Sequence, residues 1–313
     1  MRALVTGAGG FVGRYLVEAL RARGDTVFPF GGPSDAGDAP RIDLRDTQGL
    51  RAALESSAPD VIFHLAAQPF VPESIAAPMA TYEVNTLGTA RLTQAIYAYV
   101  SAGGSMPRLL FTSSAEVYGK RDPSEFPLRE SLATNPANPY AASKAAAEAI
   151  LLGEVRGLHL NAVIARSFNH IGPGQSDRFV VASFAQQLAR IAAGGEPLLM
   201  VGNLDAKRDF LDVRDVVAAY LALADSGVRG EIYNVCSGVA RPIRDALREL
   251  IIAARVPVEV REDPDRMRPS DTPIFVGDST KLQRATGWEP RIVFAASIRA
   301  IYAAAAGNLQ GHS

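Results

Sequence analysis

Short apolar runs and stretches of helical periodicity alternate through the first half of the chain. Five runs suit strands buried in a parallel sheet: residues 2–6, 26–30, 61–65, 108–112 and 161–165. Apolar positions at helical spacing, with polar residues opposite them, lie between the runs: residues 11–20, 47–56, 79–102 and 140–152. This order predicts an α/β fold built on a Rossmann doubly wound parallel sheet.

The alternation ends near residue 166, where loops rich in proline and glycine begin. Further helices are expected near residues 179–194, 213–224 and 242–254, and the run at 231–235 predicts a strand that returns to the sheet. We therefore expect two interleaved parts. Residues 1–167 and 204–237 form a dinucleotide-binding Rossmann domain, and residues 168–203 and 238–305 form a smaller substrate-binding region.

Three glycines separate the first expected strand from the first expected helix. Gly7 allows a tight turn, Gly10 lets the backbone approach a pyrophosphate, and Gly13 lets the helix lie close to the strand. The N–H groups and positive partial charge of the helix N-terminus then favour phosphate binding. The spacing is G-x-x-G-x-x-G, which differs from the G-x-G-x-x-G pattern, and a plain strand–turn–helix is the alternative.

The choice between NAD and NADP stays open at the sequence level. An acidic residue at the end of the second strand favours NAD and a nearby arginine favours NADP, but the strand ends in Phe-Gly-Gly. Arg41, Asp35 and Asp38 are near in sequence only. Asp43, followed by Leu44, is expected after a third strand, where its carboxylate would accept from the adenine amino group. A solvated loop aspartate is the alternative.

Tyr140 and Lys144 form the expected chemical centre. They are four residues apart on a predicted helix, so they share one face. An ammonium beside a phenol favours the phenolate, which predicts a lowered pKa for Tyr140 and proton exchange with a substrate oxygen during hydride transfer. Lys144 would also reach the nicotinamide ribose. The alternative is a surface tyrosine beside a solvated lysine.

Ser114 and Glu116 follow the strand at 108–112, and the carboxyl ends of such strands face the ligand crevice. The Ser114 hydroxyl is expected to hydrogen-bond the substrate oxygen that Tyr140 protonates, with Ser113 as the competing candidate. Glu116 is a candidate base for a carbon-bound proton. Its alternative role is to cap the following turn.

Composition excludes several classes of function. The 313 residues are 48% hydrophobic and carry a net charge of −1, which fits a globular enzyme and gives no reason to expect a nucleic-acid or membrane partner. The single cysteine, Cys236, excludes a disulfide framework and a cysteine metal site, and we expect no bound metal. Without a signal peptide or a long apolar segment, the cytoplasm is the expected location.

With these residues in place, the chain resembles the extended short-chain dehydrogenase/reductase family over nearly its whole length. The motifs that carry the resemblance are Thr6-Gly-x-x-Gly-Phe-Val-Gly13, His64-Leu-Ala-Ala67, Asn85-x-x-Gly-Thr89, Ser114, Tyr140-x-x-x-Lys144 and Arg208-Asp-Phe-x-x-Val213. The resemblance implies a nucleotide-diphosphate-sugar substrate and a nicotinamide cofactor. It also implies cofactor contacts from Phe11, Val12, Leu65, Ala66, Ala67 and His170.

The segments Arg166-Ser-Phe-Asn-His-Ile-Gly-Pro-Gly174 and Arg268-Pro-Ser270 look most like GDP-6-deoxy-4-ketohexose reductases and the related GDP-mannose 4,6-dehydratases. This likeness implies that Asn169, Arg208 and Arg268 contact the substrate, with the arginines clamping its pyrophosphate. The alternative for these arginines is pairing with neighbouring acids such as Asp209 and Asp271. Members of the family often pair helices across a dimer, so a homodimer is expected.

One departure ranks the possible reactions. Sugar-nucleotide dehydratases usually carry a proton donor between the positions matched by Ser114 and Glu116, and this chain has Ala115. Reduction of a GDP-4-keto-6-deoxyhexose therefore ranks first. An epimerase or isomerase that keeps NAD bound and uses Glu116 as base ranks second, and dehydration of GDP-mannose ranks third. A non-catalytic dinucleotide sensor is the alternative from another class, and the retained Tyr–Lys pair disfavours it.

Overall fold

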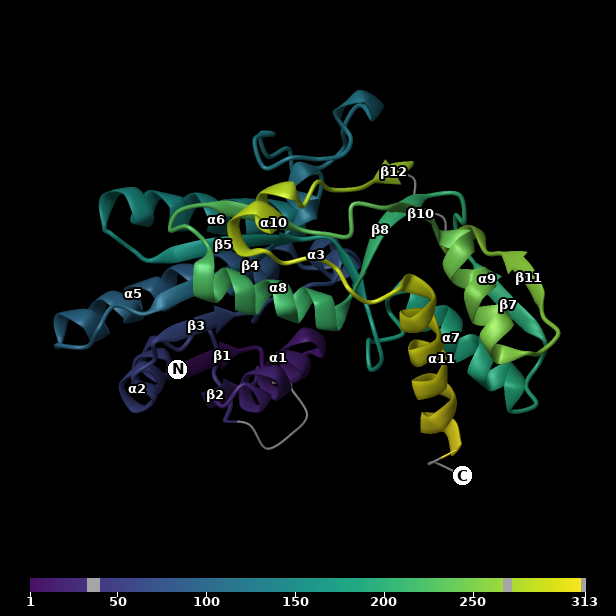
Figure 1. Cartoon of the computed structure of the whole chain (residues 1–313), viewed down its shortest axis with the longest axis horizontal. Coiled ribbons are helices and arrows are strands. Elements are labelled where there is room, and N and C mark those ends of the chain that lie inside the picture. Colours follow the sequence, from purple (N-terminus) through teal and green to yellow (C-terminus); the bar gives the residue numbers. More distant parts are fainter. Residues whose placement is uncertain (33–39, 267–271, 311–313) are drawn as a thin grey trace.

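The computed structural model describes residues 1–32, 40–266 and 272–310 of the chain (Figure 1). Its main sheet has six parallel strands in the order β2-β1-β3-β4-β5-β9. Their bounds are β1 Arg2–Thr6, β2 Thr26–Phe30, β3 Val61–His64, β4 Arg108–Ser114, β5 Ala162–Ser167 and β9 Ile232–Val235. The predicted doubly wound parallel sheet is confirmed, including the late return of β9.

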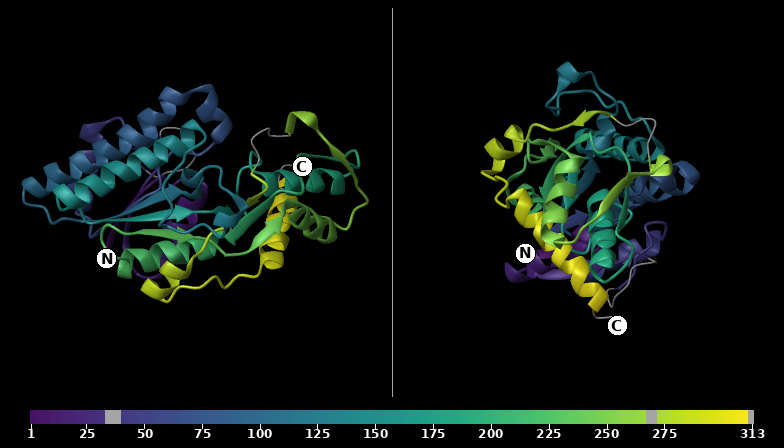
Figure 2. Two further views of the ribbon diagram at one scale, coloured as in Figure 1. Left: turned by 90° about the horizontal axis from the view of Figure 1, so that it is seen from above. Right: turned by 90° about the vertical axis from the view of Figure 1, so that its right-hand side faces the viewer.

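Helices cover both faces of this sheet because successive strand residues point to opposite sides. Ala3 and Val5 of β1 pack against α1 and α8, whereas Leu4 packs in the core formed with α2, α5 and α6. Figure 2 shows these helical layers on opposite sides of the strands. The bounds are α1 Phe11–Ala22, α2 Thr47–Ser57, α5 Gly88–Ser101, α6 Pro139–Gly157 and α8 Val213–Ser226.

The helix expected over residues 79–102 is interrupted. The chain instead forms α4 Pro78–Tyr82, a π-helical turn Glu83–Leu87 and α5. Asn85 in the π turn donates to the Gln68 carbonyl and the Ser143 hydroxyl, both at 3.0 Å, and accepts from the Gln68 N–H at 2.8 Å. The extra residue of a π turn therefore directs a buried amide between α6 and the loop after β3, and such turns are frequent at functional sites.

Two strand predictions needed correction. The third strand expected before Asp43 is reduced to a single bridge between Gly31 and Arg41, followed by a turn that leads into α2. β4 is longer than expected and includes Ser114 as its last residue, because the paired strand β5 extends to Ser167. The main sheet therefore reaches Ser114 without an intervening loop.

The remaining elements form a smaller lobe, which lies to the right of the main sheet in Figure 1. It contains a four-stranded sheet of β10-β8-β12 with β6 beside β8, and a β7–β11 pair. The strands are β6 Asn169–Ile171, β7 Leu198–Val201, β8 Lys207–Asp212, β10 Ala240–Pro242, β11 Glu259–Glu262 and β12 Ile274–Phe275. The helices are α7 Val180–Ala192, α9 Ile243–Ala254 and α11 Phe294–Gln310. α3 Val71–Ala76 and α10 Thr280–Thr286 are short connecting helices.

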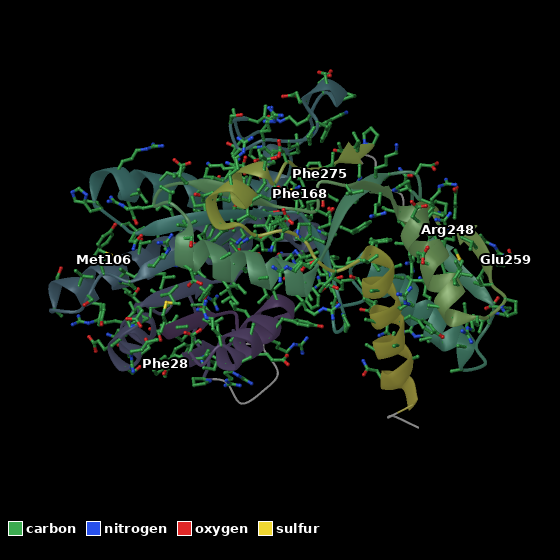
Figure 3. All side chains as sticks on the ribbon, viewed as in Figure 1. Phe28, Met106, Phe168, Arg248, Glu259 and Phe275 are labelled. Carbon is green, nitrogen blue, oxygen red and sulfur yellow. The ribbon has the colours of Figure 1, made fainter. Side chains whose placement is uncertain are left out.

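A small aromatic cluster joins the lobe to the main sheet. Phe168, after β5, and Phe275, in β12, have ring centroids 5.6 Å apart and lie side by side in Figure 3. They pack with buried Tyr118 and Cys236, which explains the single cysteine as a core residue. The lobe keeps a separate core among α7, α9 and α11. The proposed domain boundaries stay a prediction, and β8 joins the small sheet although it falls in the segment assigned to the Rossmann domain.

Within the described part of the chain, no helix combines the length and apolar character needed to cross a bilayer.

Candidate functional site

The glycine turn after β1 lies at the point where the strand order reverses. β1 pairs with β2 on one side and β3 on the other, so its carboxyl end opens into the crevice where such folds bind ligands. Gly7 has φ of +73°, and a Cβ there would meet the Ala66 backbone nitrogen at 2.7 Å. Gly13 must lack a side chain, because a Cβ there would lie 2.1 Å from the Gly7 carbonyl oxygen.

The first turn of α1 fits the pyrophosphate of a dinucleotide. Gly10 is its N-cap and supplies no side-chain hydrogen bond, so the N–H groups of the first turn are not capped by it. Phe11 begins the helix and Val12 packs against the core below it. A cradle with glycines on one side and uncapped helical N–H groups on the other is the arrangement that phosphate requires.

The other residues expected at the cofactor border this turn. Leu65, Ala66 and Ala67 follow β3, and Ala66 touches Gly7 as described above. The His170 ring stacks on the Phe11 ring with centroids 6.0 Å apart. The segment after His170 is fastened to α1, where the Tyr15 hydroxyl donates to the Pro173 carbonyl at 2.8 Å.

Asp43 and Leu44 follow the Gly31–Arg41 bridge rather than a strand. The Asp43 carboxylate accepts from Arg45 Nη2 at 2.6 Å and from its Nε at 2.9 Å, and these bonds hold the pKa of Asp43 below its usual value. Leu44 packs against Gly88 of α5, where a Cβ would meet it at 2.8 Å. Asp35 and Asp38 lie outside the described residues.

Tyr140 and Lys144 both lie near the N-terminus of α6, which begins after the Asn138 cap. Asn138 accepts from the Ala141 N–H at 2.8 Å, and the Tyr140 N–H donates to the Ser74 hydroxyl at 3.2 Å. Ser114, at the end of β4, lies close enough to the Tyr140 phenol to lower its pKa. The structure therefore brings Ser114 to Tyr140, with Lys144 one turn further along α6, whereas the Ser113 hydroxyl faces α6 and donates to Glu148.

The electrostatics of Tyr140 differ from the sequence prediction. Burial raises its pKa to about 12, the hydrogen bond to Ser114 opposes this rise, and the Glu116 charge adds to it. The Lys144 ammonium donates to the Thr112 carbonyl at 2.8 Å, and burial lowers its own pKa to about 8. The predicted lowering of the Tyr140 pKa is wrong, because desolvation of the buried phenolate is the largest effect and outweighs the opposing effect of Ser114.

Glu116 lies on the same side as the Tyr140 phenol. It is exposed, and its Oε2 accepts from Asn138 Nδ2 at 3.3 Å. The turn after β4 is capped by the Ser114 hydroxyl, which accepts from the Glu116 N–H at 3.2 Å. The capping role considered for Glu116 belongs to Ser114, and the Glu116 carboxylate is left at the mouth of the site.

Sequence reasoning missed a buried ion pair behind Lys144. Arg166 donates to both carboxylate oxygens of Glu148, at 2.6 Å from Nη2 and 2.9 Å from Nε, and both side chains are under 5% exposed. The Ser113 hydroxyl donates to the same carboxylate at 2.5 Å. The sequence signals only the place of Glu148, which follows Lys144 by four residues and therefore lies on the same helical face; it does not signal the partner Arg166.

Two of the residues expected to bind substrate lie on the small sheet. Asn169 of β6 is exposed and pairs in register with Phe210, two residues after Arg208 on β8. Arg208 Nη1 donates to the Thr272 carbonyl at 2.8 Å. Asp209, the suggested partner of Arg208, accepts instead from Ser237, Gly238 and Gly277. Arg268 and Asp271 lie outside the residues that the structure describes.

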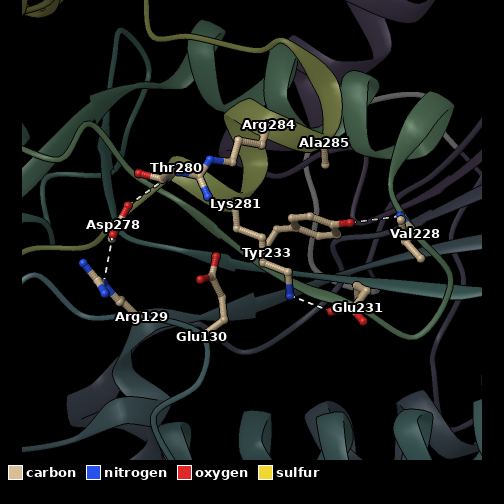
Figure 4. Close-up of a pocket in the computed structure, with 10 residues that line it drawn as sticks. All are labelled: Arg129, Glu130, Val228, Glu231, Tyr233, Asp278, Thr280, Lys281, Arg284 and Ala285. Atoms are coloured by element: carbon tan, nitrogen blue, oxygen red, sulfur yellow. Dashed lines mark hydrogen bonds and ion pairs between the residues drawn. The ribbon is translucent and has the colours of Figure 1, made fainter.

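A separate pocket lies at the free edge of β9, beside α10, and contains none of the expected site residues (Figure 4). Its charges are paired: Lys281 contacts Glu231 at 2.6 Å, and Arg129 contacts Asp278 at 3.1 Å. Because opposite charges balance within the pocket, it offers no selective attraction for a phosphorylated ligand.

Comparison with known proteins agrees with this geometry. A family model described as GDP-mannose 4,6 dehydratase matches residues 4–301. The chain is 41% identical over 303 residues to a GDP-6-deoxy-D-mannose reductase of Pseudomonas aeruginosa, covering 96% of this chain and 95% of that protein. It is 30% identical over 303 residues to a GDP-6-deoxy-D-talose 4-dehydrogenase of Aggregatibacter actinomycetemcomitans, with the same coverage.

Solved structures give the same grouping. The structure of RMD from Pseudomonas aeruginosa complexed with NADPH is 39% identical, with a TM-score of 0.88 over 98% of this chain and 100% of that one. A Thermus thermophilus UDP-glucose 4-epimerase complexed with NAD is 34% identical, with a TM-score of 0.85 over 98% and 99%. The family model and these relatives together show that the chain belongs to the GDP-mannose 4,6-dehydratase family, within the extended short-chain dehydrogenases/reductases.

Proposed function

We propose that this protein reduces the 4-keto group of a GDP-4-keto-6-deoxyhexose, using NADPH or NADH. The observation that carries the proposal is that the Tyr140 phenol lies close enough to Ser114 for that side chain to lower its pKa, with the buried Lys144 ammonium one helical turn further along α6. Tyr140 is protonated at neutral pH. A protonated phenol is the form that a ketone reduction needs, because the developing alkoxide must receive a proton. The similarity to a named GDP-6-deoxy-D-mannose reductase supports the sugar class.

The roles of the residues follow from their positions. The bound nicotinamide would supply hydride to C4 of the sugar. Tyr140 donates its phenolic proton to the C4 oxygen, and the Ser114 hydroxyl donates a hydrogen bond to the same oxygen. Lys144 has three N–H donors and uses one on Thr112, so its other donors are available to hold the nicotinamide ribose.

Two of the proposed substrate contacts, Asn169 and Arg208, come from the small lobe. Together with Arg268 they would bind the nucleotide sugar, with the guanidinium groups on its pyrophosphate. The cofactor would lie across Gly7, Gly10, Gly13, Phe11 and Val12, with Leu65, Ala66, Ala67, Asp43, Leu44 and His170 around it. Arg41 supports NADPH, because the bridge to Gly31 places it at the end of β2, where the adenosine ribose is read.

Glu116 supports a second candidate reaction. Its carboxylate sits close enough to Tyr140 to raise the pKa of that phenol, so a base is present at the mouth of the site. An enzyme that keeps NAD bound, oxidises the sugar transiently and returns hydride after epimerisation would use such a base. Dehydration is disfavoured, because the methyl group of buried Ala115 has no proton to donate.

The deciding experiment starts from protein purified without added cofactor. We expect no stoichiometric dinucleotide to be released on denaturation, no conversion of GDP-mannose, and one NAD(P)H oxidised per GDP-4-keto-6-deoxymannose consumed, followed at 340 nm and by mass spectrometry. The product should be two mass units heavier than the ketone. Tightly bound NAD with a new GDP-hexose of unchanged mass would instead establish the epimerase or isomerase and exclude the reductase.

The proposal includes a homodimer built on the layer of α4, α5 and α6. Met79 is 75% exposed and Leu87 is 45% exposed on this layer, and small residues face solvent on α6. We expect sedimentation to give twice the 33.2 kDa chain mass, and a Met79→Glu, Leu87→Glu variant to shift towards the monomer. A wild-type protein that stays monomeric at tens of micromolar would contradict this assembly.

A further inference from the structure

We propose that Glu148 is a positioning residue for the reduction: its buried carboxylate, clamped by Arg166 and Ser113, keeps Lys144 in the ammonium form beneath Tyr140. The proposal rests on the proposed function for the activity measured, but its central claim concerns the charge of Lys144. That claim is also tested through cofactor binding alone, without any sugar substrate.

Three donors hold the Glu148 carboxylate. Arg166 binds both carboxylate oxygens, and the Ser113 hydroxyl adds a third donor at 2.5 Å. The Arg166 guanidinium also lies over the Tyr118 ring, 4.7 Å from its centroid. The three side chains come from α6, β5 and β4, so the carboxylate is fixed relative to the whole carboxyl edge of the sheet rather than to one helix.

The groups around Lys144 make Glu148 its source of negative charge. Lys144 is 3% exposed, donates to the Thr112 carbonyl and lies 4.8 Å from the Phe111 ring centroid. Tyr140 is neutral, as shown by its raised pKa. His64 on β3 is also neutral, because burial and the Lys144 charge lower its pKa to about 3. Glu148 is the carboxylate that favours the lysine charge.

A buried ammonium needs such a partner. Burial disfavours the charged form of a lysine, and in this protein it lowers the Lys144 pKa to about 8 while Glu148 opposes the decrease. The opposing carboxylate therefore favours the cationic form of Lys144. Arg166 has a separate task, since its guanidinium supplies the counter-charge that a buried carboxylate needs.

The test is the pH dependence of Glu148→Gln. Losing the carboxylate should lower the Lys144 pKa by about one unit or more, so the decline of kcat/KM on the alkaline side should begin at correspondingly lower pH. Activity at pH 8 should fall about tenfold, and activity at pH 6 should approach that of the wild type. The pH at which NADPH affinity declines, measured by fluorescence titration without sugar, should be lowered by the same amount.

Two further variants make the result decisive. Glu154→Gln is the matched control: it is the same substitution on α6, but Glu154 accepts from Thr93 and Tyr97 and should leave both pH profiles unchanged. Glu148→Gln leaves Arg166 as an unpaired buried cation, which is strongly destabilising. The double variant Glu148→Gln, Arg166→Gln removes that cation and should recover the melting temperature while keeping the shifted profiles.

Each outcome has a definite meaning. Shifted profiles in both Glu148 variants, with an unshifted control, support the proposal. A folded variant whose activity falls equally at every pH, or whose profiles match the wild type, overturns it and leaves Glu148 a structural residue. If no reductase activity is found in the wild type, the NADPH titration still decides the role of Glu148, so the two failures are distinguishable.

Discussion

Tyr140→Phe should lower kcat by about 10²–10⁴-fold, the usual range for loss of a general acid. The ring would still fill its site, but the proton for the C4 oxygen would have to come from water. Burial raises the Tyr140 pKa to about 12, so the wild-type group stays protonated over the whole pH range of an ordinary assay. The measurement is the steady-state rate of NAD(P)H oxidation, with NADPH affinity measured separately.

The appropriate control is Tyr97→Phe, which removes the hydroxyl of a half-buried tyrosine that contacts Glu154 on the far part of α6. That variant should keep wild-type kcat. Turnover unchanged in Tyr140→Phe would remove the phenol from catalysis. If kcat of the wild type rose with pH around 7 and this rise were lost in Tyr140→Phe, the reacting form of Tyr140 would be the phenolate, which the structure disfavours.

Gly13→Ala should abolish measurable dinucleotide binding and destabilise the protein by about 1–3 kcal/mol, the usual cost of overpacking. The added Cβ would lie 2.1 Å from the Gly7 carbonyl and 2.8 Å from the Ala8 Cα, both backbone atoms that cannot rotate away. α1 would have to move off β1 and take its N-terminal N–H groups with it. Thermal unfolding and fluorescence titration with NADPH measure the two effects.

Gly307→Ala on α11 is the control, because a Cβ there meets nothing within 4 Å. Its stability should be unchanged or slightly higher, since alanine favours helix more than glycine does. A Gly13→Ala protein that binds NADPH with wild-type affinity would show that the close contact of α1 with the turn is not what positions the phosphate site.

The sequence predicted the parallel sheet and most of its helices, because strand and helix periodicities are local properties of buried and half-buried segments. It also predicted the glycine turn and the Tyr140–Lys144 pair, since each depends on a short fixed spacing. It failed at the π turn around Asn85 and at the strand before Asp43. Around Asn85 a long-range contact with Ser143 accompanies the altered backbone path, whereas before Asp43 the pairing is limited to the bridge between Gly31 and Arg41.

By itself, then, the sequence predicted the fold class, which is confirmed, and pointed to the glycine turn and to the tyrosine that we propose to react. The tertiary structure alone decided the charge states. Desolvation depends on what covers a group, so only the assembled fold raises the pKa of Tyr140 and lowers that of Lys144. The Glu148–Arg166 pair joins residues on α6 and β5 that are 18 positions apart, and no local pattern assigns that partner.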